Sequence, residues 1–527
     1  MKAQRLLHDA LVERGESPET RARHALVADG RCYTFGELLA SARCLATTLR
    51  ERGVRRGDRV AIALENSWAC VVSIYATLVA GGVIVLIHPQ TRADKLGFIL
   101  RDSDARVFIA EGRQGDLVAH ALDRLDVRPA TLATDASGNS PAESFDAALA
   151  SAAPLAAPVP VIPLDLAAIL YTSGSTGAPK GVMQTHQSMV FTVGSLVEYL
   201  RLTSAERMLC VLPLSFDYGL YQLLIAVSLG ACLVLERSFT FLGQLFERLS
   251  TERITVFPGV PTIFATLIAA HRRKPLHFPS VTRVTNTAAA LPDEFDGALR
   301  EIFPQALLYK MYGLTECKRV SYLEPELVDA RPGSVGKAIP GTEIYLLSSD
   351  GTPVPPGETG ILHVRGPHVM AGYWNRPDLS DEMLKPGPLP GERVLCTHDL
   401  FRMDDEGFLY FVGRTDDIIK TRGEKVSPVE VESALHRIPG VLEAAVIGVP
   451  DPLLGEAVWA VVVADPALGL TLQSIRAGCA SLLEPHMVPN QVIFRDSLPR
   501  TPNGKVDKRQ LIDEAHREHP ADPERAR

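Results

Sequence analysis

The residues of this chain best suited to chemistry lie at 171–182, which read Tyr-Thr-Ser-Gly-Ser-Thr-Gly-Ala-Pro-Lys-Gly-Val. Within them, three glycines, three hydroxyl side chains and one lysine fall in the ten residues from Ser173 onward. The apolar run Leu166–Tyr171 predicts a buried strand before the loop, and apolar residues at helical spacing from Met189 to Leu200 predict a helix after it. A Gly-rich loop between a strand and a helix surrounds phosphate oxygens with N–H groups and hydroxyls, so we expect ATP to bind here.

This loop is not a Walker A motif, because Pro179 stands where that motif has Gly and Gly181 stands where it has Ser or Thr. The alternative is a flexible Gly/Ser turn without a ligand. The ordered run Ser-Gly-Ser-Thr-Gly-x-Pro-Lys-Gly resembles the phosphate loop of the adenylate-forming superfamily, which includes acyl-CoA synthetases, peptide-synthetase adenylation domains and luciferases. The resemblance assigns the ATP phosphates to Thr172, Ser173, Gly174, Ser175, Thr176, Gly177 and Lys180.

A second motif, Met311-Tyr312-Gly313-Leu314-Thr315-Glu316, follows another strand-like run. A Glu beside a phosphate loop is a candidate magnesium ligand, since Mg²⁺ combines carboxylate with phosphate oxygens; the alternative is a solvated surface Glu. The order resembles the Tyr-Gly-x-Thr-Glu motif of the same superfamily. That resemblance implies that Tyr312 and Gly313 meet adenine, that Thr315 contacts phosphate, and that Glu316 is catalytic and holds the metal.

Two further segments resemble parts of the superfamily that bind the nucleoside. Asp399 is expected to accept both ribose hydroxyls, although His398 stands where the family usually has Gly, and Arg414 matches an arginine that also contacts ribose. The alternative for Arg414 is a surface salt bridge. Ala288 and Ala289 stand where relatives often have Gly-Gly-Ala, and we expect their backbone to contact adenine.

The segment Pro499–Asp507 resembles the loop that carries the C-terminal catalytic lysine of the superfamily, here Lys505. The alternative is one more exposed Lys near a charged tail. In the family the C-terminal domain rotates about a hinge, and the resemblance places that hinge at Asp416. The rotation is expected to replace Lys505 by Lys420, and Gly423 is expected to leave room for a pantetheine thiol.

The segment Leu212–Gly219 bears on the acid that is activated. Many acyl-CoA ligases have Phe-His at this point, whereas this chain has Phe216-Asp217, as peptide-synthetase adenylation domains do. In those domains the Asp binds the substrate ammonium; here Asp217 either does the same, or it caps a helix or pairs with a neighbour. Arg319 falls where pocket residues lie in adenylation domains, and it meets either a second carboxylate or water. The predicted acid-binding residues are Phe216, Asp217, Tyr218, Tyr221, Met311 and Arg319.

The elements that position these residues alternate between strand and helix through most of residues 30–410, which predicts an α/β protein. At 527 residues more than one core is expected. We predict a large N-terminal domain of wound α/β sheets (1–414) that binds ATP and the acid, a small mobile α+β C-terminal domain (415–515) and a frayed tail (516–527). Residues 134–160, rich in Ala, Pro and Ser, are expected to form a surface connection.

The net charge of −8 argues against a nucleic-acid partner, and eight scattered cysteines fit a reduced, cytoplasmic protein. No signal peptide is apparent, and the uncharged stretch 66–91 is interrupted by Gly81-Gly82, so we expect a buried helix–turn–strand unit and no membrane insertion. The resemblance, strongest to stand-alone bacterial acyl ligases, predicts an ATP- and Mg²⁺-dependent acid–thiol ligase that forms an acyl-AMP.

The chain carries no phosphopantetheine-attachment segment, so CoA or a carrier protein must supply the thiol in trans. The alternatives are an amino-acid adenylating enzyme that loads a separate carrier protein, with Asp217 on the ammonium, and a luciferase-like oxygenase. A non-catalytic nucleotide-binding relative would be expected to lack Lys180, Glu316 or Lys505, and all three are present.

Overall fold

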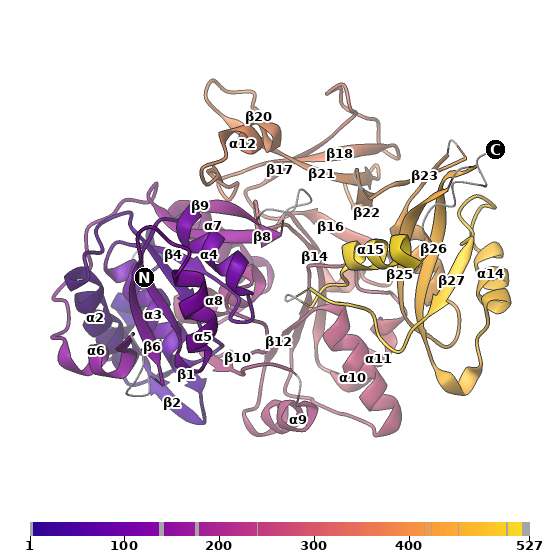
Figure 1. Ribbon diagram of the computed structural model, residues 1–527. Helices are drawn as coiled ribbons and strands as arrows, with labels where there is room; N and C mark the ends of the chain where they lie inside the picture. The colour runs from indigo at the N-terminus through magenta and orange to yellow at the C-terminus, as the bar shows by residue number, and fades with distance from the viewer. Residues whose placement is uncertain are drawn as a thin grey trace.

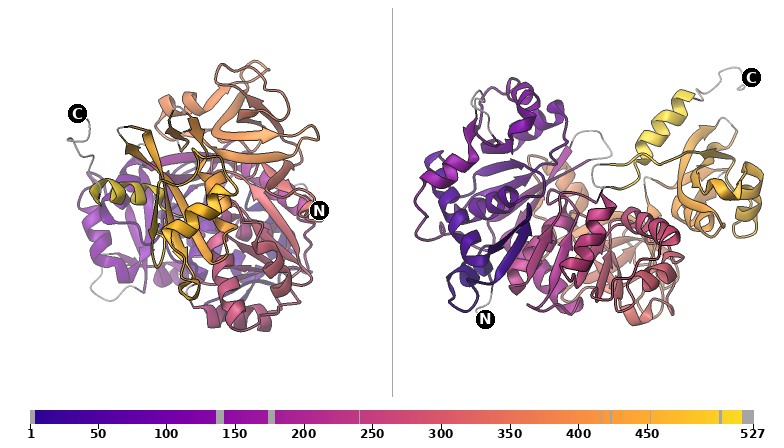
Figure 2. Two further views of the ribbon diagram at one scale, coloured as in Figure 1. Left: turned by 90° about the vertical axis from the view of Figure 1, so that its right-hand side faces the viewer. Right: turned by 90° about the horizontal axis from the view of Figure 1, so that it is seen from below.

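The computed structural model describes residues 4–135, 142–173, 179–239, 241–415, 417–422, 424–451, 453–501 and 504–518. The N-terminal residues form two packed sheets with helices between and around them, and the C-terminal residues form a separate lobe on one side (Figures 1 and 2). This arrangement confirms the predicted α/β class, with a large N-terminal and a small C-terminal part.

The first sheet has the order β19-β9-β8-β4-β3-β5-β6-β7, and β3 to β8 are parallel where they pair. Its strands are β3 (Arg59–Ala63), β4 (Val83–Leu86), β5 (Ala105–Glu111), β6 (Ala130–Thr134), β7 (Glu143–Ser144), β8 (Leu166–Ser173), β9 (Pro179–Thr185) and β19 (Gly372–Tyr373). Its helices are α2 (Phe35–Glu51), α3 (Trp68–Val79), α4 (Ala93–Asp102), α5 (Gly115–Leu122), α6 (Phe145–Ser151) and α7 (His186–Tyr199).

The second sheet begins as a parallel α/β sheet and continues as an antiparallel one. Its parallel part contains β1 (His24–Ala28), β10 (Arg207–Cys210), β11 (Cys232–Leu235), β12 (Val256–Gly259), β13 (Arg283–Asn286) and β14 (Leu307–Tyr312), with α1 (Asp9–Glu16), α8 (Asp217–Leu229), α9 (Leu242–Thr251), α10 (Pro261–Arg273) and α11 (Phe295–Ile302). The strands of its antiparallel part are β2 (Arg31–Thr34), β15 (Ser321–Leu323), β16 (Ser334–Ala338), β17 (Glu343–Leu347), β18 (Thr359–Arg365), β20 (Leu384–Pro386), β21 (Arg393–Met403) and β22 (Leu409–Arg414), with α12 (Pro377–Met383) before β20.

The C-terminal lobe is a small sheet of β23 (Ile419–Thr421), β24 (Glu424–Val426), β25 (Val441–Asp451), β26 (Gly455–Ala464) and β27 (Gln491–Phe494). It carries α13 (Pro428–His436), α14 (Leu472–Ala480) and α15 (Lys508–Glu518). It encloses its own apolar clusters, which include Val458 and Trp459 on adjacent positions of β26. Because alternate residues of a strand face opposite sides, both faces of this sheet are buried.

The uncharged stretch 66–91 forms a buried unit. Helix α3 ends at Val79, Gly81 turns the chain with a φ of +76°, and β4 follows. Ten of the residues of α3 are buried, because the helix packs inside the lobe rather than on its exterior. No described helix is both long and apolar enough to cross a membrane.

Several local predictions were wrong. Residues 134–160 include α6 and are not merely a connection, and residues after Leu307 form mostly antiparallel strands instead of continuing the alternation. Helix α15 runs to Glu518, past the expected start of the frayed tail at 516, because Leu511 and Ala515 are buried against the C-terminal sheet. Ser427 is the N-cap of α13, and its side chain accepts a hydrogen bond from the Glu430 N–H.

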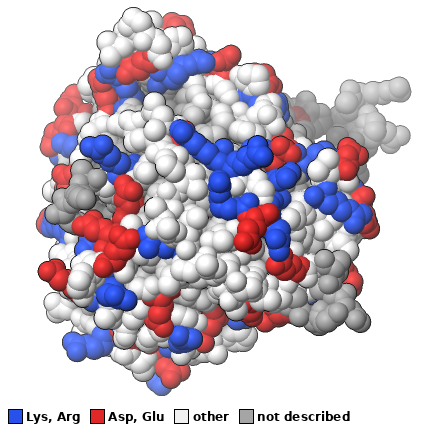
Figure 3. Space-filling view, turned by 90° about the vertical axis from the view of Figure 1, so that its left-hand side faces the viewer, with Lys and Arg blue, Asp and Glu red and all other residues white. Residues whose placement is uncertain are grey.

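The exterior carries charges of both signs. On the face of the N-terminal lobe drawn in Figure 3, basic and acidic side chains lie interspersed among uncharged ones. Many of them form ion pairs, for example Arg52 with Glu143 at 2.7 Å and Arg56 with Asp165 at 2.7 Å. Such exposed pairs contribute little to stability, so they do not explain how the site is held.

Candidate active site

The predicted phosphate loop joins β8 to β9, which pair as antiparallel strands with Thr172 opposite Lys180 and Ser173 opposite Pro179. The predicted helix after the loop is α7, but β9, which was not predicted, lies between the loop and this helix. Gly174, Ser175, Thr176 and Gly177 lie outside the described residues. Thr172 and Lys180 enter and leave the loop, and the Lys180 ammonium lies 5.6 Å from the centroid of the Tyr373 ring. The loop thus starts from a β-hairpin and not from a helix N-terminus.

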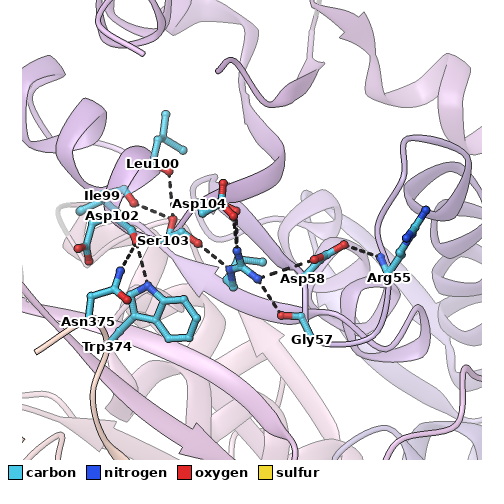
Figure 4. Close-up of polar contacts among 11 residues, drawn as sticks. Arg55, Gly57, Asp58, Ile99, Leu100, Asp102, Ser103, Asp104, Trp374 and Asn375 are labelled. Atoms are coloured by element: carbon cyan, nitrogen blue, oxygen red, sulfur yellow. Dashed lines mark hydrogen bonds and ion pairs between the residues drawn. The ribbon is translucent and has the colours of Figure 1, made fainter. Parts of the chain in front are cut away.

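A network of hydrogen bonds supports both strands that carry the loop. The backbone carbonyl of Asp102, the last residue of α4, accepts hydrogen bonds from Trp374 Nε1 at 2.8 Å and Asn375 Nδ2 at 3.0 Å (Figure 4). The Asp102 carboxylate accepts one from the Tyr171 hydroxyl on β8 at 2.5 Å. The Trp374 backbone N–H donates to the Gly181 carbonyl on β9 at 2.7 Å. These contacts anchor the base of the loop to α4 and to the segment after β19.

Thr315 and Glu316 follow β14 and face the same strands. Gln184 of β9 donates to the Thr315 carbonyl at 3.0 Å, and the Tyr373 hydroxyl donates to Glu316 Oε1 at 2.7 Å. Burial raises the pKa of Tyr373, and the neighbouring Glu316 carboxylate raises it further, so the phenol remains a donor. The second Glu316 oxygen is left to meet another group.

One carboxylate next to a phosphate loop fits magnesium, which retains several phosphate or water oxygens. Within the residues that the structure describes, no three His, Cys, Asp or Glu side chains form a metal-binding group.

Asp399 and Arg414, which are predicted to bind the nucleoside, lie where β21 and β22 pair. Asp399 and Arg414 are directly opposite each other, and Arg414 Nη1 lies 3.1 Å from Asp399 Oδ1. The Tyr312 hydroxyl also donates to the Asp399 carboxylate. Arg414 therefore pairs with a buried carboxylate and is not an ordinary surface salt bridge. His398 adopts a φ of +57°, in the left-handed region that favours Gly, which explains why this position suits the Gly usual in relatives.

Two backbone features shape the expected adenine site. Ala288 has a φ of +78°, and the turn that contains it is closed by Asn286 Nδ2, which donates to the Ala289 carbonyl at 3.0 Å. A Cβ on Gly313 would lie 2.0 Å from the Lys318 carbonyl oxygen, so Gly is required there by close backbone approach. The Tyr312 ring packs against Phe401, with its centroid 4.7 Å away.

Lys505 reaches this centre from the C-terminal lobe. The neighbouring Gly504 lies against Val260 and Thr262 of the N-terminal lobe, since a Cβ built there would be 3.8 and 3.7 Å from their side chains. The protein around Lys505 lowers the pKa of its ammonium, while the charges of Asp217, Asp399 and Glu316 raise it. The side chain is nevertheless exposed to water, so its loss of hydration is incomplete.

The two lobes also meet at α11 and α13. The ring centroids of Phe295 and His436 are 6.4 Å apart, and Arg437 Nε lies 3.7 Å from Glu294 Oε1. Lys420 is exposed on β23, and its backbone N–H donates to Glu456 of its own lobe at 2.6 Å. The predicted hinge residue Asp416 and the predicted tunnel residue Gly423 lie outside the described residues.

The residues predicted to bind the acid are buried in the N-terminal lobe. The Tyr218 hydroxyl donates to the Thr285 carbonyl at 2.8 Å, and Met311 Sδ accepts from Tyr199 at 3.1 Å. The Arg319 guanidinium carbon lies 4.8 Å from the centroid of the Tyr218 ring. Tyr218 and Tyr221 belong to α8, and Phe216 directly precedes this helix. Met311 belongs to β14, and Arg319 lies on the loop between β14 and β15.

Asp217 is in the first turn of α8, whose N-cap is Phe216, so Asp217 is not the N-cap. One of its oxygens accepts from the Tyr218 N–H at 2.8 Å. Gly219 is explained by packing, because a Cβ there would lie 2.2 Å from the Pro213 carbonyl oxygen. The presence of Gly219 therefore carries no information about the substrate.

Four residues that hydrogen-bond to the predicted site residues, or to the strands that carry them, were not predicted from the sequence: Tyr373, Gln184, Asp102 and Trp374. None of them belongs to a motif with its own chemistry, and Asp102 and Trp374 are far apart in the sequence. Their role appears only once β9 and β19 are paired.

Known proteins are similar to this chain over nearly its whole length. Residues 15–374 match the AMP-binding enzyme family and residues 430–505 match the AMP-binding enzyme C-terminal domain. A long-chain-fatty-acid–CoA ligase of Escherichia coli O6:H1 is 32% identical over 93% of this chain and 91% of its own length. A feruloyl-CoA synthase of Amycolatopsis sp is 33% identical over 94% and 97%.

Solved structures agree with the sequence matches. The ATP-bound crystal structure of MatB from Rhodopseudomonas palustris is 29% identical and covers 97% of this chain and 99% of its own, with a TM-score of 0.87. The apo crystal structure of the same protein, with the same identity and coverage, gives 0.78. On the family match, the whole-length relatives and the shared fold, this chain belongs to the AMP-binding enzyme family and is an AMP-forming ligase of the acyl-CoA synthetase class.

Proposed function

We propose that this protein joins a carboxylic acid to the thiol of CoA through an acyl-AMP, with the roles set out below. The observation that carries these roles is the position of the Lys505 loop, where Gly504 lies against Val260 and Thr262 of the other lobe and the charges of Asp217, Asp399 and Glu316 raise the pKa of Lys505. A cation contributed by a separate lobe suits a step in which negative charge develops between two anionic substrates.

In the first half-reaction a carboxylate oxygen of the acid attacks the α-phosphorus of ATP. The bond from that phosphorus to the bridging oxygen breaks, and pyrophosphate leaves with the electron pair. Lys505 is proposed to offset the repulsion between the two anions. Thr172, Ser173, Lys180 and the loop between them are proposed to hold the phosphates, and a magnesium ion on Glu316 would neutralise the leaving group.

The nucleoside is proposed to be held from the opposite side. Arg414 and Asp399 lie on paired strands at the junction of the lobes, and they are proposed to bind the ribose hydroxyls. Thr315, held through its carbonyl by Gln184, is proposed to contact the α-phosphate. Ala288, Ala289 and the Tyr312-Gly313 segment are proposed to border adenine.

In the second half-reaction the thiol sulfur attacks the acyl carbonyl, its proton passes to solvent, and AMP leaves with the oxygen that joined it to the acyl group. We propose that the C-terminal lobe rotates about Asp416 between the two steps. Lys420, now exposed, would then reach the site in place of Lys505, and Gly423 would border the thiol path. The greater similarity to the ATP-bound than to the apo MatB structure supports the state that precedes this rotation.

A second candidate function is amino-acid activation with transfer to a separate carrier protein. Asp217 favours it, because this side chain is only 8% exposed and lies within electrostatic reach of Lys505. A substrate ammonium next to the reacting carboxylate would meet Asp217 there. Pyrophosphate exchange with fatty, aryl and amino acids, repeated with Asp217→Ala, separates the two: selective loss of amino-acid exchange would favour this candidate.

The assignment of Lys505 is tested by measuring the half-reactions separately. Lys505→Ala is expected to slow acyl-AMP formation on the order of 100-fold or more, because the developing charge loses its cation, while a supplied acyl-AMP still reacts with thiol. Lys508→Ala, which removes a neighbouring cation paired with Glu432 at 2.6 Å, is the matched control. Equal loss in both half-reactions would overturn the assignment, and AMP release that required oxygen instead of thiol would indicate an oxygenase.

A further inference from the structure

Arg319 is a fully charged side chain in the interior of the N-terminal lobe. It is 2% exposed, and it is among the largest fully buried side chains of the described residues. Its guanidinium cannot lose its proton, so burial cannot be relieved by neutralisation. A buried charge is normally paired with an opposite charge and fully hydrogen-bonded.

The partners of Arg319 within the protein are incomplete. Its Nη1 donates to the Lys318 carbonyl at 2.7 Å, and its plane lies over the Tyr218 ring. Its Nε and Nη2 are buried and have no hydrogen-bond partner among the described residues. The described residues also contain no ion pair between Arg319 and a carboxylate. Nε and Nη2 form one edge of the guanidinium, which is the geometry that binds a carboxylate with two parallel hydrogen bonds.

The adjacent residue adds a second buried cation. The Lys318 ammonium donates to Ser188 Oγ at 3.1 Å, to the His368 carbonyl at 2.9 Å and to Gln184 Oε1, all of them neutral acceptors. Lys318 and Arg319 are both buried, and neither forms an ion pair with a carboxylate among the described residues, so this interior attracts negative charge.

Arg319 belongs to the same interior as the reacting centre. The Arg319 guanidinium lies over the ring of Tyr218, which follows Asp217 in the first turn of α8, and the charge of Asp217 raises the pKa of the Lys505 ammonium. Arg319 also follows Glu316 by three residues, on the loop after β14. A group that extends from a carboxylate held at Lys505 into this interior would therefore approach the unpartnered edge of Arg319.

We propose that the acid activated by this protein carries a second carboxylate, and that Arg319 binds it through Nε and Nη2. This inference rests on the proposed acid activation and specifies its substrate class: a dicarboxylic acid whose far carboxylate supplies the counter-charge that the protein itself lacks. The Tyr218 ring packs against the Arg319 guanidinium and fixes the orientation of its plane. Arg319 is thereby a specificity-determining residue and takes no part in bond making.

The test compares acids that differ only in the far group, by pyrophosphate exchange: hexanedioate, its monomethyl ester and hexanoate, with isophthalate, its monomethyl ester and benzoate as an aromatic series. The wild-type protein is expected to use a diacid with a kcat/KM on the order of 100-fold above that of its monoester, because the ester leaves the charged donors unpaired. Equal use of diacid, ester and monoacid would overturn the inference and would mean that water meets Arg319. Equal use of diacid and ester, both above the monoacid, would overturn the requirement for charge.

Variants assign the preference to Arg319. Arg319→Met is expected to remove the preference for the diacid to within a few-fold, mainly through KM for the acid, while KM for ATP is unchanged. Arg319→Lys keeps the positive charge but loses the two parallel N–H donors of the guanidinium. This variant is expected to retain part of the preference for the diacid. Arg331→Met, which deletes a guanidinium over the Phe408 ring at 4.5 Å on the exterior, is the matched control and is expected to keep the full preference. A preference that survives Arg319→Met would overturn the inference.

The two proposals fail in different ways. If no acid of either series or of the wider panel supports exchange in the wild-type protein, the proposed activation itself is wrong. If monoacids support exchange as well as diacids do, the proposed acid activation is retained, and the proposal that the substrate carries a second carboxylate is wrong. The wild-type comparison needs no variant, so it decides the matter even if Arg319→Met fails to fold.

Discussion

At the junction of the lobes the Asp399 carboxylate already has Tyr312 and Arg414 as partners, whereas inside the N-terminal lobe two N–H groups of Arg319 have none among the described residues. The first region keeps contact with water through Lys505 and Arg414, and the second is enclosed. A site whose charged groups are already paired with one another suits a ligand that all members of a family share. An unpaired buried charge suits the ligand in which members differ, because it penalises every substrate without a matching group.

Gly313 joins the two regions, so its substitution is expected to have the largest effect. A Cβ in Gly313→Ala would meet the Lys318 carbonyl oxygen at 2.0 Å, and the backbone of the whole 313–319 loop would have to move. We expect kcat/KM for ATP and for the acid to fall together, by about 100-fold or more, because displacements near 1 Å cost that much. Steady-state kinetics with each substrate varied checks this.

The control for Gly313→Ala is Gly297→Ala in α11, where a Cβ meets nothing within 4 Å. That variant is expected to keep full activity and to gain about 0.5–1 kcal/mol of stability, because Ala is favoured over Gly in a helix. A Gly313→Ala protein that lost activity toward one substrate alone would show that the two regions are not coupled through this loop.

A smaller effect is expected from Tyr373→Phe, which acts on the nucleotide region alone. The variant removes the hydroxyl that donates to Glu316 at 2.7 Å and leaves the ring under Lys180 in place. We expect about tenfold slower acyl-AMP formation and a higher magnesium concentration for half-maximal rate, since a ligand that has lost its orienting partner binds metal less well. Pyrophosphate exchange across a magnesium titration measures both.

Tyr410→Phe removes a comparable hydroxyl-to-carboxylate contact, from Tyr410 to Asp404 at 3.3 Å, away from the site, and is expected to change neither quantity. An unchanged magnesium dependence in Tyr373→Phe would remove the reason to regard Glu316 as the metal ligand. An altered preference between diacid and monoester in this variant would contradict the separation of the two regions.

The smallest effect concerns stability and belongs to the acid region. Lys318 has a pKa of about 7 in the folded protein and the ordinary value of 10.5 when unfolded, so between these pH values the unfolded chain binds more protons. The unfolding free energy is therefore expected to gain from this group as pH rises from 7 to 9, by at most about 1.4 kcal/mol per pH unit. Below pH 7 the cost of burying the ammonium is present in full.

Urea unfolding of the wild type and of Lys318→Met at both pH values isolates this contribution, since other titrating groups are common to the two proteins. The variant is expected to show a flatter rise with pH. An equal rise in both proteins would mean that burial does not lower the pKa of Lys318.

Local sequence determined the parts of this protein that recur in short segments. The run at 171–182, the Tyr312–Glu316 motif and the Lys505 loop carried the family and the reaction class, because glycines, hydroxyls and single charges there must stand at fixed spacing to meet phosphate. The buried α3–β4 unit was predictable for the same local reason: Gly81 interrupts an uncharged stretch that would otherwise read as a membrane span.

Only the tertiary structure decided which strand follows the phosphate loop, that Tyr373 holds Glu316, and that Arg319 is buried without a counter-ion. These features depend on pairing between segments far apart in the chain, such as β9 with β19. Burial and hydrogen-bond satisfaction are properties of that packing, and no spacing within one segment encodes them. The choice of acid is for this reason a tertiary property, while the chemistry of its activation is a local one.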